Sequence, residues 1–170
     1  YRFDAWLKFL LLRFPDNYLM MYRPVFQVRQ APVELDILII GPMSVWCVTL
    51  LEAAEGVVFQ GNSDRFWKKI EDSQVTGVLS PLVSNLRMFR LVSRLLKTYD
   101  LETMPIHRAV MSPLSYIDYP DAPVDVDMID RRKARQWHET MRKQSSPLKF
   151  VQLQTADHFL RHCQTVAIER

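Results

Sequence analysis

The chain has 170 residues, of which 48% are hydrophobic and 24% charged, and its formal net charge is +3. This composition is typical of a single globular domain and excludes an intrinsically disordered chain. No apolar run reaches the roughly 18 residues that a transmembrane helix needs. The two cysteines, Cys47 and Cys163, make no disulfide framework, so we expect a reducing, cytoplasmic setting and no membrane segment in this chain.

The N-terminal part of the sequence predicts a helix followed by a strand. Residues 1–14 carry apolar side chains at helical spacing, and Pro15 ends that pattern. Asp4 lies in the first turn, where its negative charge either interacts favourably with the helix dipole or points toward acids further along the chain. Residues 18–28 alternate loosely between apolar and polar, and Pro24 among them indicates a strand at a sheet edge.

The stretch from Glu34 to Glu52 predicts a β-hairpin. Its first half is an apolar run rich in β-branched residues, namely Leu35, Ile37, Leu38, Ile39 and Ile40. Residues 41–44 read Gly-Pro-Met-Ser, and a second apolar run follows at once. A connection this short joins antiparallel neighbours. Glu34 and Asp36 are two residues apart, so on one strand they would share a face. They then either lie at a solvated strand edge or bind a hard cation such as Mg²⁺.

Three further strands are predicted along the chain. Residues 57–59 should pair with the second hairpin strand and extend an antiparallel meander. Phe66 and Trp67 should then cover one end of the sheet. Residues 106–111 read as a strand that Ser112-Pro113 ends. Residues 124–128 alternate between apolar and acidic, which indicates a strand with one wet face.

A long helix should begin at Ser80-Pro81, which supplies an N-cap and a proline at the first helical position. It should end near Lys97. Its predicted sheet-facing row is Leu82, Leu86, Phe89, Val92 (or Ser93) and Leu96. A basic row lies off that face and is read as a solvated helix back rather than a phosphate contact: Arg87, Arg90, Arg94 and Lys97.

The C-terminal part is basic and predicted to be helical. Residues 131–149 hold seven basic residues against the single acid Glu139. This asymmetry indicates either contact with a polyanion such as DNA or a solvated helix face. The candidate nucleic-acid-binding residues are Arg131, Arg132, Lys133, Arg135, Arg142 and Lys143. A last helix should begin at Ser145-Ser146-Pro147; its His158 and His162 have a zinc-compatible spacing but are more simply surface histidines.

The order of these motifs resembles the nuclease-related domain, a branch of the PD-(D/E)xK nuclease superfamily. The resemblance covers roughly residues 3–130 and rests on the acid-x-Asp pair, the Ile-Gly-Pro turn between two hydrophobic strands, a Gly-x(n)-Trp element at Gly61 and Trp67, and Ser-Pro-Leu at Ser80 in place of Asn-Pro-Leu. It implies an α/β (α+β), restriction-endonuclease-like fold, with a central mixed sheet and an antiparallel hairpin meander flanked by helices. Residues 1–130 would be this core, and residues 131–170 a basic helical extension packed on the same domain.

The resemblance also implies a metal centre, from which this chain departs. In the family the second hairpin strand carries Glu-x-Lys: the Glu completes the metal site and the Lys orients the attacking water. Alignment on Gly41-Pro42 puts Thr49 and Leu51 in those two places. Glu52 has the opposite strand parity unless a bulge turns it. The candidate catalytic residues are therefore Asp36, Glu52, Glu34 and Asp4, with Asp36 and Glu52 as metal ligands, in a centre that has lost part of its motif.

The sequence supports three hypotheses for function. The first is a nuclease-like domain that no longer catalyses and binds DNA or a protein partner without a cofactor. The second is an active Mg²⁺- or Mn²⁺-dependent nuclease with a migrated centre, in which Lys68 or Lys69 replaces the lost lysine. The third is a structural or protein-interaction module without nucleic acid. The missing Glu and Lys favour the first, because both groups normally contribute orders of magnitude in rate.

Overall fold

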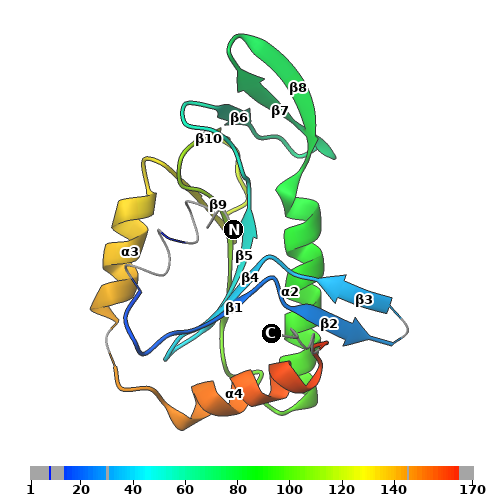
Figure 1. Ribbon diagram of the computed structural model, residues 1–170, viewed down its shortest axis with the longest axis vertical. Helices are drawn as coiled ribbons and strands as arrows, with labels where there is room; N and C mark the ends of the chain where they lie inside the picture. Colours follow the sequence, from blue (N-terminus) through cyan, green and yellow to red (C-terminus); the bar gives the residue numbers. More distant parts are fainter. Residues whose placement is uncertain (1–7, 9–13, 30, 145, 165–170) are drawn as a thin grey trace, which may run out of the picture.

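A mixed five-stranded sheet forms the centre of the chain, whose computed structural model describes residue 8 and residues 14–29, 31–144 and 146–164 (Figure 1). Three antiparallel neighbours, β1, β4 and β5, are followed by β9 and β11, which run parallel to β5. These strands are β1 Leu19–Tyr22, β4 Ile37–Ile40, β5 Val45–Leu50, β9 Ile106–Ser112 and β11 Val126–Asp130. The helix predicted over residues 1–14, including Asp4, lies outside the described residues except at residues 8 and 14.

The predicted central hairpin is confirmed. Ile37 of β4 pairs with Val48 of β5, and Ile40 pairs with Val45. Between the strands, the Gly41 N–H donates to the Ser44 carbonyl at 2.9 Å and closes the turn. All of β4 is buried, as a strand covered on both faces should be, and this accounts for its unbroken apolar run.

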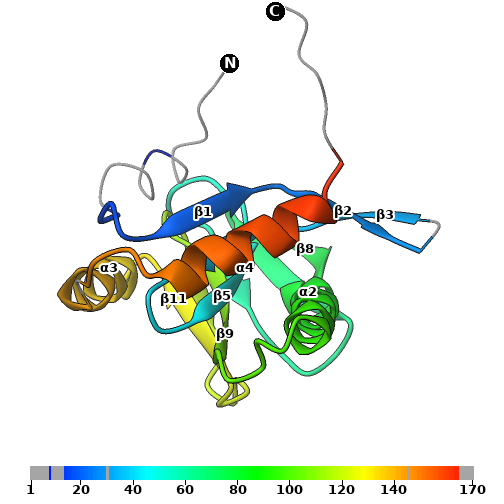
Figure 2. The ribbon, with the colours of Figure 1, turned by 90° about the horizontal axis from the view of Figure 1, so that it is seen from below.

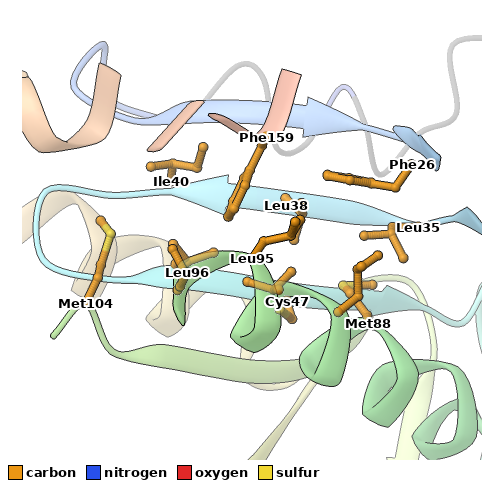
Figure 3. Packing of buried hydrophobic residues seen from close by; sticks show 13 residues of the cluster. Phe26, Leu35, Leu38, Ile40, Cys47, Met88, Leu95, Leu96, Met104 and Phe159 are labelled. Atoms are coloured by element: carbon orange, nitrogen blue, oxygen red, sulfur yellow. The ribbon is translucent and has the colours of Figure 1, made fainter. Parts of the chain in front are cut away.

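Helices cover both faces of this sheet (Figures 1 and 2). One face packs against α3 (Ala134–Lys143), whose Trp137 and Met141 join the apolar cluster around Ile39. The other face packs against α2 (Pro81–Thr98) and α4 (Phe150–Arg161), and Figure 3 shows Phe159 of α4 and Leu38 of β4 within that cluster. Within the described part of the chain, no helix is both long and apolar enough to cross a membrane.

The long helix begins where the sequence predicts, and its inner face matches the predicted one in part. Ser80 caps α2 by accepting a hydrogen bond from the Leu82 N–H at 3.2 Å. The buried side chains are Pro81, Asn85, Met88, Leu91, Val92, Leu95 and Leu96, whereas Leu82, Leu86 and Phe89 are half-buried. Two adjacent rows of α2 are apolar, and the predicted row lacked the polar Asn85. Val92 and Leu96 of the predicted row are therefore buried as expected, whereas its N-terminal half lies beside the buried row.

The strand predicted over residues 57–59 exists, but its predicted pairing is wrong. β6 (Val58–Gln60) belongs to a second sheet, in the order β10-β6-β7-β8, and not to the central meander. The open edge of β5 is taken instead by the parallel strand β9. The other strands of this second sheet are β10 Tyr116–Asp118, β7 Phe66–Glu71 and β8 Gln74–Leu79. Phe66 and Trp67, expected to cover a sheet end, are the first residues of β7, and only Trp67 is buried.

A small additional hairpin precedes the central one. β2 (Val25–Val28) pairs with β3 (Ala31–Glu34), and Arg23 and Pro24 separate β2 from β1. Glu34 therefore ends β3, while Asp36 lies in the bend that leads into β4. The expectation that Glu34 and Asp36 share one strand and one face is thus wrong, because the chain changes sheets between them.

Candidate functional site

Asp36 is held where the central hairpin opens. Its Oδ2 accepts a hydrogen bond from the Leu50 N–H at 2.8 Å, and its carbonyl accepts one from the Arg23 N–H at 2.7 Å. Burial raises the pKa of the Asp36 carboxyl above its ordinary value. The hydrogen bond from Leu50 and the charge of Arg23 oppose this rise, while the charges of Glu52 and Glu34 add to it. Asp36 is therefore a positioned acid in a crowded, partly desolvated place.

Glu52 lies near Asp36 but is engaged with another residue. Its Oε1 accepts a hydrogen bond from the Arg23 guanidinium at 2.8 Å, in an ion pair that is about half exposed on both sides. The structure thus brings Asp36, Glu52 and Glu34 within electrostatic reach of one another. Glu34 and Glu52 are both exposed, and Asp4 is outside the described residues.

Two of these acids already have partners that compete with a hard cation. Mg²⁺ takes octahedral oxygen ligands at about 2.1 Å and uses one or two carboxylates aimed at it. One oxygen of Asp36 already accepts the Leu50 N–H, and Glu52 is paired with Arg23. Among the residues that the structure describes, no group of three or more His, Cys, Asp or Glu side chains converges so as to hold a metal ion.

Thr49, at the place where the resemblance implies a metal-binding Glu, is turned inward. The pairing of Ile37 with Val48 sets Asp36 beside Thr49, one step beyond the paired stretch. The Thr49 side chain is buried, and its Oγ1 accepts a hydrogen bond from the Asn85 amide of α2 at 3.0 Å. Leu51, at the place of the Lys, packs in the apolar cluster around Trp67.

A polar network beneath α2, which sequence reasoning missed, starts from Asn85. The fully buried Asn85 amide donates to the carbonyls of Cys47 and Ala109, each at 3.2 Å, as well as to Thr49. Its Oδ1 accepts from the Arg108 Nε at 2.9 Å, and Arg108 then reaches Asp125 at 3.0 Å. The signal was present in the sequence, because an asparagine one turn after Ser80-Pro81 interrupts an otherwise apolar helix face.

The Gly-x(n)-Trp element joins the second sheet to the loop after β10. Trp67 is fully buried, and its indole N–H donates to the Asn62 carbonyl at 3.0 Å. Its ring meets the edge of Tyr119, with centroids 5.5 Å apart. A Cβ on Gly61 would lie 2.6 Å from the same Tyr119 ring, so this position has room for glycine alone. Gly61 and Trp67 therefore act in packing.

The basic C-terminal segment is partly neutralised by acids of the same chain. Arg131 pairs with Glu55 at 2.9 Å, Arg132 with Asp130 at 2.7 Å, and Arg135 with Glu139 at 3.5 Å. The other three candidates are exposed and, within the described residues, form no ion pair: Lys133, Arg142 and Lys143. Of the two lysines considered as replacements for the lost one, Lys69 pairs with Glu71 on β7 at 3.6 Å.

His158 of α4 and His162, the C-cap residue of α4, pack around one aromatic ring. The His158 ring stacks on Tyr99 with centroids 3.8 Å apart, and the Tyr99 hydroxyl lies 2.6 Å from His162 Nε2. Tyr99 is the C-cap of α2, so these contacts tie the end of α2 to α4. The spacing of four residues that suggested zinc thus places both rings against a tyrosine.

The comparisons with known proteins identify no relative of this chain. No protein-family model, no curated protein and no solved structure matches this chain. The geometry above is accordingly the basis for any functional proposal.

Proposed function

We propose that this chain is a nuclease-like domain with a degenerate catalytic centre, which acts by binding a partner rather than by hydrolysis. The order of its central elements supports the proposal: an antiparallel β1-β4-β5 meander, the α2 crossover and a parallel β9. The resemblance to PD-(D/E)xK nucleases implies a central mixed sheet with an antiparallel meander flanked by helices, and Asp36, the acid that it singles out, lies in the bend before β4. A similar fold does not by itself imply a similar activity, so the proposal depends on the residues of the candidate metal centre.

The observation that carries the proposal is the hydrogen bond that the Asn85 amide donates to the inward-facing Thr49 Oγ1. A buried hydroxyl satisfied by a buried amide is a structural contact, and its side chain offers nothing to a cation at the surface. Glu52 is the nearest candidate to replace the metal-binding Glu of the family, but its carboxylate forms an ion pair with Arg23. A metal-dependent mechanism therefore lacks both its second ligand and its lysine.

A protein partner fits the basic C-terminal segment better than DNA does. Nonspecific DNA binding needs several free cations, each of which meets a phosphate. Half of the six candidate residues, namely Arg131, Arg132 and Arg135, are already in ion pairs within the chain. The cations of residues 131–149 that form no ion pair within the described part of the chain are Lys133, Arg142, Lys143 and Lys149, which is a small set for a polyanion.

An active nuclease is the second candidate, and the mutual proximity of Asp36, Glu52 and Glu34 favours it. For this role Glu52 would have to leave Arg23, since a divalent cation needs its carboxylate. A dependence of DNA cleavage on the divalent cation therefore distinguishes this candidate from the proposed function.

A hydrolysis assay tests the proposal against that alternative. Supercoiled plasmid and single-stranded DNA are incubated with the chain in Mg²⁺ or Mn²⁺, alongside the Asp36→Ala variant. We expect wild type and variant to leave both substrates intact to the same extent, because the centre lacks its ligand and its lysine. Metal-dependent cleavage by wild type that Asp36→Ala abolishes would contradict the proposal.

A further inference from the structure

An open groove of about 590 Å³ lies between the β2–β3 hairpin and α2. Its apolar lining is wholly aliphatic: Val28, Val33, Leu79, Val83, Leu86 and Leu91. Leu79, at the end of β8, and Val83, in the first turn of α2, are each about half exposed, at 50% and 51%. Aliphatic side chains left accessible in a concave surface typically mark a binding site.

Three arginines of α2 run along this groove. Arg87, Arg90 and Arg94 line it, all three are exposed, and within the described residues none forms an ion pair. α2 contains no acidic residue at all. Their spacing of three and four residues puts them on one helical stripe, with a rise of roughly 4.5 and 6 Å between neighbours. The groove therefore offers an apolar floor beside an uncompensated positive row.

We propose that this groove binds an acidic amphipathic helix of a partner protein. A partner helix with apolar residues at positions i, i+3 and i+7 would fill the floor, and acidic residues beside them would repeat at the spacing of the arginine row. The apolar side chains of the partner would pack on the aliphatic floor of the groove. Its carboxylates would meet the guanidinium groups of the arginines, which bind carboxylates in bidentate fashion. The proposal rests on the proposed function, since it names the partner class of a domain that acts by binding.

Single-stranded nucleic acid fits this surface less well. Proteins that bind single strands stack the bases on aromatic side chains, and none of the described residues that line the groove is aromatic. The phosphates would meet the arginines, but the bases would face valine and leucine.

Fluorescence anisotropy with two designed peptides tests the proposal. Both are 18-residue helices with the same leucine stripe, flanked in one peptide by Glu and in the other by Lys. Wild type should bind the Glu peptide and not the Lys peptide. The Arg87→Glu/Arg90→Glu variant should weaken binding of the Glu peptide by about tenfold or more and gain affinity for the Lys peptide, because the charge pairs are reversed.

The matched control carries the same charge change on α3. Arg142→Glu/Lys143→Glu should bind the Glu peptide as wild type does, and circular dichroism should show all three proteins equally folded, since every substituted side chain is exposed. Failure to bind the Glu peptide, equal binding of both peptides, or equal losses in the two variants would overturn the proposal. So would a preference for single-stranded DNA or anionic vesicles that the α2 variant removes. Metal-dependent DNA cleavage would overturn the proposed function alone.

Discussion

Replacing Asn85 with alanine should lower the free energy of unfolding by about 3 kcal/mol, because it removes the centre of a buried polar network. The change leaves Thr49 Oγ1 and two strand carbonyls without their shared donor. It also strips an acceptor from Arg108, whose side chain is only 11% exposed. A buried guanidinium that loses an acceptor adds to the cost.

Urea unfolding followed by circular dichroism measures this loss. Lys97→Ala is the matched control, since Lys97 lies on the exposed side of the same helix and should change stability by less than about 0.5 kcal/mol. A change for Asn85→Ala no larger than that of the control would mean that the network beneath α2 does not stabilise the fold. The inward role assigned to Thr49 would then lose its support.

Replacing Asp130 with alanine should also cost about 3 kcal/mol at neutral pH. The Asp130 carboxylate is buried at the end of β11 and accepts hydrogen bonds from the Ile117 N–H, the Arg132 N–H and the Arg132 guanidinium. Without it, the backbone N–H of Ile117 loses its partner where β10 approaches β11. The junction between the two sheets should loosen as a result.

The effect of Asp130 should depend on pH with a definite sign. Burial alone would raise the pKa of Asp130, but the hydrogen bonds from Arg132 and Ile117 outweigh it and hold the pKa below its ordinary value of 3.8. The folded state therefore binds the proton more weakly than the unfolded state does. The stabilisation is fully present above pH 3.8 and is lost as the pH falls through the depressed pKa.

The free-energy gap between wild type and Asp130→Ala should thus shrink in acid. Urea midpoints at neutral pH and at successively lower pH, down to the acid limit of the folded protein, measure that gap. Asp127→Ala serves as the control, because Asp127 is an exposed acid on the same strand. A gap that stays constant down to low pH would show that the charge of Asp130 contributes nothing.

The strongest local signals of the sequence correspond to real elements. The run from Leu35 to Leu51 forms the central hairpin, because unbroken apolar strands around a tight turn leave little choice of pairing. Ser80-Pro81 starts α2, because cap and proline act within a single turn. Both features depend on neighbours in sequence, so sequence alone is sufficient to predict them.

The pairing of strands that lie far apart in the sequence was harder to predict. β6 pairs with β7 and β10 rather than with β5, and β7 and β8 were not predicted, because β8 is almost wholly exposed and lacks alternating burial. The N-terminal half of the inner face of α2 was misjudged because both of its candidate rows are apolar. The arginine row was read as a solvated helix back, and only the packing of the β2–β3 hairpin beside α2 places it along a groove.

Calorimetric titration of Mn²⁺ into wild type and into Asp36→Ala tests most directly the proposal that the metal centre is degenerate. Glu52→Gln is the companion variant, since it neutralises the carboxylate that would be the second metal ligand of an active nuclease. The account predicts superimposable, nonspecific heats for all three proteins, because Thr49 faces α2 and Glu52 is bound to Arg23. A single-site isotherm in wild type that disappears in both variants would contradict the account and show that the metal centre survives.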